Sequence, residues 1–306
     1  MKVVSKIKNL INRIFKVFLA LIPNKYLRAK LKADWTKFFI RKYTDIAVKN
    51  YEENKKQTNN NPMACFIPEL PLPPVFQFWE QGIENTPLMV KTCVDSIKKF
   101  EPDLKHIVLD YKSIEDYVEI PSYIYDLKNK GKIKSAQFSD ILRSCLLGTR
   151  PCLWVDSTVL FTGKLPDYIK ERDFFMFKGV SKTPEQFAGA NYFIFSKAVN
   201  PLLAELKDAI LEYWKDNDFL VSYFTHPHYI SLLAKQNKEL WNKIPVVDER
   251  LTLQFSQILF DKFDESNFNN IISNFPIHKL SYKIPENLKI DLKDTYYTKI
   301  EEKFNA

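Results

Sequence analysis

Two aspartates and one arginine in the middle of the sequence have positions that are typical of a polar functional site. Asp156 directly follows the hydrophobic run CLWV, and the hydroxyl residues Ser157 and Thr158 come after it. Asp140 and Arg143 are three residues apart in SDILRS, so on a helix they share one face. An acid directly after a buried run is costly without a partner, so we interpret Asp156 as a functional residue. The alternatives are that Asp156 only caps a turn and that Asp140 only pairs with Arg143.

Apolar runs alternate with helical patterns around these positions. The expected strands are 75–79, 106–110, 152–161 with a polar break after 156, 174–180 and 190–196. The expected helices are 87–102, 135–148 capped by Ser135 or Ser139, 200–217 with Pro201 in the first turn, and 218–236 interrupted at Pro227. This alternation predicts an α/β sandwich with a mainly parallel central sheet. Such sheets bind ligands beyond the carboxyl ends of their strands, where Asp110 and Asp156 both lie.

Composition argues against several classes of site. The chain has 306 residues, of which only 6 are glycine, and it contains neither GxGxxG nor GxxxxGK[ST]. Dinucleotide and P-loop nucleotide sites are therefore not expected. The four cysteines, Cys65, Cys93, Cys145 and Cys152, form no CxxC pair, so zinc-ribbon spacing is absent and we expect a reducing compartment.

The net positive charge of the chain is confined to its N-terminal part. Residues 1–50 hold 13 Lys and Arg but 2 Asp and Glu, whereas the other 256 residues hold 32 basic and 35 acidic groups. A nucleic-acid enzyme would carry its basic patch in the body of the protein, so nucleic acid is not an expected partner. We expect three parts: a basic helical segment at 1–50, a polar linker at 51–62 and a single domain at 63–306.

The first 23 residues have the pattern of a basic amphipathic helix that stops before Pro23. Its two apolar rows are Val3, Ile7, Leu10, Ile14, Val17 and Leu21, and Val4, Ile11, Phe15, Phe18 and Ile22. The uninterrupted apolar run is far shorter than the ~20 residues that a transmembrane helix needs. We therefore predict a helix that lies on the anionic inner face of the cytoplasmic membrane. The alternative is an ordinary helix packed on the domain.

An ordered set of motifs resembles a known family. The motifs are FWEQG, LDYKSIEDYVEIPSYI, GKIKSAQFSDILRSCLL, LWVDSTVLFTGKLP, NYFIFSKAVNPLL with EYWK, and PIHKLSYK, and they run from about Phe76 to Lys283. In this order they resemble the capsular polysaccharide synthesis proteins, which are related to sugar transferases with a DXD motif. The resemblance implies a GT-A glycosyltransferase fold, a Rossmann-type sandwich, with a nucleotide-sugar donor and a divalent metal.

The resemblance also implies a metal site. Asp156 matches the first acid of the motif, Thr158 stands where the second acid is expected, and His278 would complete the ligands from the tail. A histidine ligand favours Mn²⁺ over Mg²⁺. TRPCL also stands where the family pattern has Gly-Gly before the strand. The alternative is metal-independent catalysis, in which the charge of the diphosphate is taken by Arg143, Lys279 and Lys283.

The remaining site residues follow from the same resemblance. Asp156, Asp140 and Arg143 are the expected catalytic residues. The expected donor-binding residues are Trp79, Gln81, Asp110, Ser139, Asp140, Arg143, Asn191, Tyr192 and Lys279. Core packing is an equally good interpretation of the Trp79 region. The resemblance leans towards a retaining reaction, although no residue stands out as a general base for an inverting one.

Two functional hypotheses fit these features. The first is a hexosyltransferase-type glycosyltransferase that works in capsular or other surface polysaccharide synthesis. It would use a nucleotide-sugar donor and a lipid-linked glycan acceptor, peripherally on the inner face of the membrane. The second is a membrane-docked scaffolding relative whose catalytic motif has decayed, for which Thr158 and the missing Gly-Gly are the support.

Overall fold

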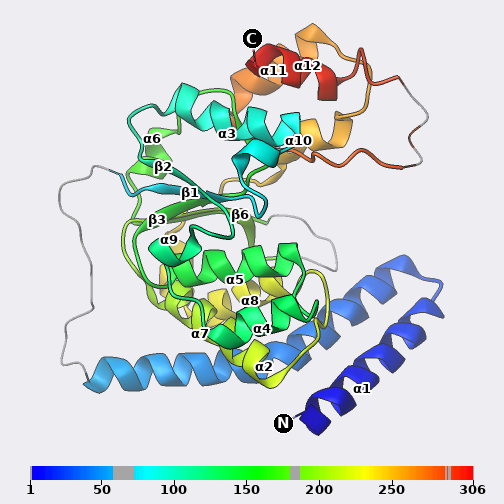
Figure 1. The fold of residues 1–306 in the computed structure, drawn as a ribbon, viewed down its shortest axis with the longest axis vertical. Helices are drawn as coiled ribbons and strands as arrows, with labels where there is room; N and C mark the ends of the chain where they lie inside the picture. Colours follow the sequence, from blue (N-terminus) through cyan, green and yellow to red (C-terminus); the bar gives the residue numbers. More distant parts are fainter. Residues whose placement is uncertain (1, 58–71, 180–186, 287, 289–290, 306) are drawn as a thin grey trace.

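The computed structural model describes residues 2–57, 72–179, 187–286, 288 and 291–305 (Figure 1). Its strands are β1 (Val75–Phe78), β2 (His106–Leu109), β3 (Cys152–Val155), β4 (Val159–Phe161), β5 (Phe174–Lys178), β6 (Gly189–Ser196) and β7 (Ile277–Lys279). Its α-helices are α1 (Lys2–Ala20), α2 (Lys25–Gln57), α3 (Leu88–Phe100), α4 (Ser122–Asn129), α5 (Ser135–Leu147), α6 (Asp167–Lys170), α7 (Pro201–Asp216), α8 (Thr225–Gln236), α9 (Lys238–Lys243), α10 (Arg250–Ile258), α11 (Glu265–Asn274) and α12 (Tyr296–Asn305). Two short 3-10 helices, η1 (Ile83–Asn85) and η2 (Ile114–Asp116), lie in loops.

A five-stranded sheet forms the centre of the molecule, in the order β2-β1-β3-β6-β5. Strand β1 pairs in parallel with β2 and β3, whereas β6 runs antiparallel to both β3 and β5. Within this sheet all strands except β6 therefore point the same way, which confirms the expected α/β class with a mainly parallel sheet. The carboxyl ends of β1, β2 and β3 consequently meet at one edge.

The central strands are continuous apolar runs because helices cover both faces of the sheet. Every residue of β1, β3 and β4 is buried. The one polar residue of β1, Gln77, is satisfied inside: its amide donates to the carbonyl of Asp156, and its oxygen lies 2.8 Å from His106 Nε2. A buried polar group is tolerated when it is bonded in this way.

Helices form a layer on each side of the sheet (Figure 1). On one side α5 packs on β3 and α8 on β6, α7 packs on both of these helices, and α2 packs behind them on α7 and α8. On the other side α3 lies near β2 and β4, beside α10, α11 and α12. These last helices enclose a second, smaller apolar cluster that includes Met89, Phe255 and Tyr296.

Three sequence predictions need correction. Residues 159–161 do not extend β3, because the chain turns after Asp156 and β4 pairs with β7 in a separate sheet. Helix α8 is not interrupted at Pro227, because it begins at Thr225 and the proline lies in its first turn, where the missing N–H is not needed. The N-cap of α5 is Lys134, not Ser135 or Ser139.

Helix α2 extends further than the sequence predicted. It continues to Gln57, so residues 51–57 of the expected linker are helical, while residues 58–62 and Cys65 lie outside the described residues. Its buried residues Ile40, Tyr43 and Ala47 belong to the main core. The helix is therefore packed as part of the domain.

We predict that Ile40→Ala lowers the free energy of unfolding by about 2–5 kcal/mol, because it removes a fully buried side chain from the contact of α2 with the core. The matched control is Ile46→Ala on the exposed side of the same helix, which should change it by less than ~0.5 kcal/mol. Urea unfolding followed by circular dichroism measures both. Equal effects of the two substitutions would contradict a structural role for this helix.

Candidate active site

Helix α5 brings a buried arginine to the carboxyl end of β3. The side chain of Arg143 is 5% exposed, and its Nη2 lies 3.0 Å from Asp156 Oδ1 and 3.5 Å from Asp140 Oδ1. Its Nη1 donates to the carbonyl of Asn191 on β6, and Nη2 donates to Ser139 Oγ at 3.3 Å. One guanidinium therefore joins α5, β3 and β6, and it brings together the three residues whose spacing first drew attention.

Lys279 is the second cation on Asp156. It lies on β7 opposite Val159, and its Nζ donates to Asp156 Oδ2 at 3.0 Å and to Thr158 Oγ1 at 2.6 Å. The indole N–H of Trp154 donates to Asp156 Oδ1 at 3.0 Å. Both oxygens of this carboxylate are therefore engaged, one by each cation.

The two carboxyl groups titrate very differently. Burial by itself would raise the pKa of Asp156, but Arg143, Lys279 and the Trp154 N–H together hold this pKa well below its ordinary value. Burial raises the pKa of Asp140 to about 7, and the negative charge of Asp156 adds to this rise. The attraction of Arg143 opposes the rise but does not cancel it. Near neutral pH Asp156 is thus ionised, whereas Asp140 takes up and releases a proton. Divergent pKa values in one cluster are typical of functional sites.

A chain of hydrogen bonds behind the cluster fixes Asp140. The amide of Asn191 donates to Asp140 Oδ1 and lies 3.3 Å from His226 Nδ1, while His226 Nε2 lies 3.0 Å from Ser144 Oγ. Burial lowers the pKa of His226 well below its ordinary value, so the ring is neutral. Since Ser144 Oγ donates to the carbonyl of Asp140, we assign the N–H of the ring to Nε2. Neither His226 nor Ser144 was among the predicted site residues; the i,i+4 spacing of Ser144 from Asp140 could have indicated the serine, whereas no spacing in the sequence connects His226 to the site.

The cluster opens into a cavity of about 730 Å³. Ten of the predicted site residues line this cavity: Trp79, Gln81, Ser139, Asp140, Arg143, Asp156, Thr158, Asn191, Tyr192 and Lys279. Lining residues that were not predicted include Tyr223, Phe224, Glu249 and Tyr282. Nothing in the local sequence distinguishes the three aromatic residues from other surface or core aromatics, or Glu249 from other surface acids.

An aromatic pair stands on one wall of the cavity. The rings of Trp79 and Tyr282 meet edge to face, with centroids 5.2 Å apart, and Lys283 lines the cavity beside them. The indole N–H of Trp79 is buried and has no hydrogen-bond partner among the described residues. The ring of Tyr192 lies under Lys279, with its centroid 5.7 Å from Nζ. These walls offer stacking faces and a free donor next to two cations.

Two predicted residues do not join the cluster. Asp110 Oδ1 accepts from the backbone N–H groups of Lys112 and Ser113, so this carboxylate holds its own turn. His278 is fully buried, its Nε2 lies 3.1 Å from Thr162 Oγ1, and its ring packs on Phe255. Neither residue lines the cavity.

The residues present do not fit a divalent cation held by Asp156, Thr158 and His278. The Lys279 ammonium already bonds to both Asp156 and Thr158, while burial lowers the pKa of His278 to about 3 and its ring is used elsewhere. Within the described residues, no group of three or more His, Cys, Asp or Glu is arranged to hold a metal ion. The position expected for a cation is thus taken by a lysine.

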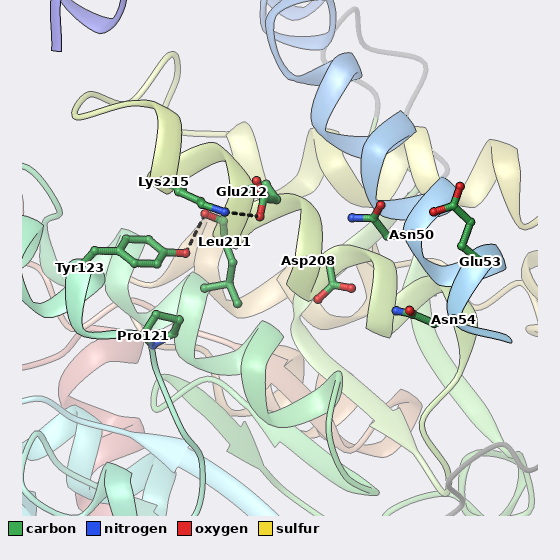
Figure 2. A pocket seen from close by; sticks show the side chains of 9 residues that line it. All are labelled: Asn50, Glu53, Asn54, Pro121, Tyr123, Asp208, Leu211, Glu212 and Lys215. Carbon is green, nitrogen blue, oxygen red and sulfur yellow. Dashed lines mark hydrogen bonds and ion pairs between the residues drawn. The ribbon is translucent and has the colours of Figure 1, made fainter. Parts of the chain in front are cut away.

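A second cavity, of about 490 Å³, lies between α2, α4 and α7 (Figure 2). Its wall carries Glu53, Asp208 and Glu212, and its one lysine, Lys215, is paired with Glu212 at 3.3 Å. An acidic wall repels a phosphate-bearing ligand. The cavity of about 730 Å³ that Arg143 and Lys279 line is therefore the candidate active site.

Residues 20–300 match the family described as capsular polysaccharide synthesis protein. The chain belongs to this family. No match was found among the curated proteins. Among solved structures, the one titled "PaToxG Glycosyltransferase" is similar over 89% of this chain and 97% of its own, with 14% identity and a TM-score of 0.41. A likeness at this level carries no argument about function.

The raised pKa of Asp140 predicts a pH-dependent difference between this capsular polysaccharide synthesis protein and its Asp140→Asn variant. A carboxyl group whose pKa is higher in the folded state than in the unfolded state stabilises the fold at low pH, and this contribution is lost as pH rises towards the folded pKa. The stability of the wild type should therefore fall relative to the variant by up to ~2 kcal/mol from pH 5 to pH 7, and level off above. Urea unfolding at each pH measures the difference, and a constant difference would show that Asp140 titrates normally.

Proposed function

We propose that this protein is a glycosyltransferase of the GT-A type that transfers a sugar from a nucleotide-sugar donor to a glycan acceptor in capsular polysaccharide synthesis. The observation that carries the proposal is the Arg143–Asp156–Lys279 cluster in a cavity beyond the carboxyl end of β3. Membership in the capsular polysaccharide synthesis family supports the pathway. Ligands of α/β sheets bind at the carboxyl ends of the strands, which supports this cavity as the position of the donor site.

The chemistry of the cavity suits a nucleotide diphosphate. Cleavage of a sugar–phosphate bond leaves negative charge on the diphosphate, and positive groups placed beforehand stabilise that charge. Lys279 and Lys283 line the cavity, and Arg143 lies behind the carboxylate that holds Lys279. We infer that the diphosphate binds beside Lys279, while Trp79 and Tyr282 frame the base.

Lys279 is the residue proposed to stabilise the negative charge that develops on the diphosphate. Asp156 and Thr158 hold its ammonium, and these are the residues at which the resemblance to DXD sugar transferases implies a metal. A lysine supplies one positive charge and three donors without the need for hard oxygen ligands. The alternative is an Mn²⁺ that arrives with the donor and displaces Lys279 from Asp156. Measuring activity with and without metal separates the two.

Asp140 and Asn191 are the proposed contacts to the transferred sugar. Asp140 lies next to the ionised Asp156, lines the cavity and has a pKa near neutrality. It can therefore accept a bond from a sugar hydroxyl when ionised or donate one when protonated. Asn191 holds it in place from β6.

The acceptor and its location form a further part of the proposal. We infer a lipid-linked glycan acceptor and a peripheral position on the inner face of the cytoplasmic membrane. The support is the membership in a capsule synthesis family and the excess of 13 basic over 2 acidic residues in the first 50. Anionic lipids of the inner leaflet attract such a segment.

The scaffolding alternative rests on Thr158 in place of a second acid. The cluster argues for activity, because a decayed site has no need to keep a buried arginine between two carboxylates at a cost of several kcal/mol in desolvation. Release of a nucleoside diphosphate from a panel of nucleotide sugars decides between the two hypotheses. A folded protein that binds and turns over no donor would favour the scaffold.

We predict that Lys279→Met lowers the rate of donor cleavage by at least ~100-fold, since it removes the cation beside the diphosphate. The matched control is Lys243→Met on the exposed part of α9, which should leave the rate unchanged. UDP and GDP release, measured with EDTA and with Mn²⁺, gives the readout. Wild-type activity that persists in EDTA supports the lysine mechanism, and activity that requires Mn²⁺ supports the metal alternative.

We predict that Asp156→Asn is also impaired by ~100-fold or more, because Lys279 loses the anion that positions it and Arg143 loses its closest charged partner. Since the substitution can lower stability, urea unfolding and thermal shift with nucleoside diphosphate accompany the kinetics. A folded variant with unchanged turnover would remove Asp156 from the mechanism.

A further inference from the structure

Helix α1 packs on the body through one side that carries two polar residues and one leucine. Ser5, Asn12 and Leu19 are buried, and they follow one another at intervals of seven residues, which places them on one side of the helix. Ser5 Oγ donates to Asp218 Oδ1 at 2.7 Å. Asn12 Oδ1 accepts from the indole N–H of Trp35 on α2 at 2.9 Å. Hydrogen bonds thus determine which side of α1 faces inward.

The apolar side of α1 consequently faces outward. The exposed apolar residues of this segment are Val3, Val4, Ile7, Leu10, Ile11, Ile14, Val17, Phe18 and Leu21, with 47% to 77% of each surface accessible. Figure 1 shows α1 on the outside of the molecule, beside α2 and away from the sheet. Contiguous exposed apolar surface of this kind is rare on monomeric soluble proteins and marks an interaction site.

An aromatic row continues this surface onto α2. Phe15 stacks on Trp35 with centroids 4.3 Å apart, and Phe18 and Phe38 extend the row at either end. Phe18 is 53% and Phe38 is 73% exposed. The two helices therefore share one apolar surface, which we call the outward face.

The charged residues of α1 are all of one sign. Helix α1 has five basic residues and no acidic residue, and Lys6, Arg13 and Lys16 are exposed. In a symmetric dimer the same patch meets itself, so these charges would be brought towards one another. An anionic surface instead meets both the apolar side chains and the cations with complementary chemistry.

We propose that the outward face of α1, with Phe38 of α2, binds the surface of an anionic lipid bilayer, with α1 lying in the plane of the interface. This deepens the membrane location proposed above and names the surface that makes the contact. None of the helices within the described ranges is both long and apolar enough to cross a membrane.

The same contact places the active-site cavity near the bilayer. Asp218, which accepts from Ser5, and Val221, whose carbonyl accepts from Asn12, lie in the loop between α7 and α8. Tyr223 and Phe224 of this loop line the cavity. A lipid-linked acceptor would therefore approach along a wall that α1 holds in place.

The test is co-sedimentation of the full chain with phosphatidylglycerol vesicles and with phosphatidylcholine vesicles. The wild type should bind the anionic vesicles at least ~10-fold more tightly, and Leu10→Glu with Ile14→Glu should reduce that binding by at least ~10-fold. Both substituted residues are exposed, so folding is not affected. Val246→Glu, an exposed apolar residue elsewhere, is the matched control and should bind like the wild type.

Two outcomes would overturn the inference. One is equal binding of the wild type and the double variant to anionic vesicles. The other is a stable dimer, measured by light scattering without lipid, that the double variant dissociates, because the outward face would then be covered by a second copy. No sugar donor is used, so failure of this test leaves the transferase proposal intact, and an inactive enzyme that still binds vesicles leaves this inference intact.

Discussion

The buried guanidinium of Arg143 is the constraint on which the candidate site depends. A positive charge with 5% of its side chain exposed is stable only where opposite charge and hydrogen-bond acceptors surround it. Asp156 at the end of β3, Asp140 on the same helix and the carbonyl of Asn191 on β6 provide them. The packing of α5 on the sheet and the geometry of the polar cluster are therefore fixed by one group.

This constraint also makes the two carboxylates unequal. Asp156 has Arg143 and Lys279 on its two oxygens and stays ionised, whereas Asp140 competes for Arg143 at the longer distance and lies near the Asp156 charge. Two acids of the same type can then serve two roles at one pH, one as a permanent anion that positions Lys279 and one as a proton-exchanging contact. The two pKa values differ because Asp156 has two cations at 3.0 Å, whereas Asp140 has one at 3.5 Å.

Local sequence patterns predicted most of the helices and strands. The contacts within the site depend on strand register and helix packing, which local patterns do not determine. The strands at β1, β2, β3, β5 and β6 and the helix with Asp140 and Arg143 follow from apolar runs and from spacing. The sequence placed both His278 and Lys279 in the site, but β7 pairs with β4 so that only Lys279 meets Asp156, because neighbouring residues on a strand point to opposite faces. That register joins segments more than 100 residues apart, so one position of offset exchanges a histidine for a lysine. His226 was missed for the same reason, since only its place on α8, against Ser144 of α5 and Asn191 of β6, brings it to the site.

The orientation of helix α1 is a second feature that the sequence alone does not determine. An amphipathic pattern tells that a helix has two faces, but which face lies inward depends on the partner surface. Here Ser5 and Asn12 find acceptors and donors on the body, so these two polar side chains are satisfied there and the apolar rows are left outside. In water this arrangement leaves nine large apolar side chains unburied, an amount of surface that favours transfer to an apolar phase. The hydrogen bonds that hold α1 on the body and the apolar face that it turns outward are thus two consequences of one orientation.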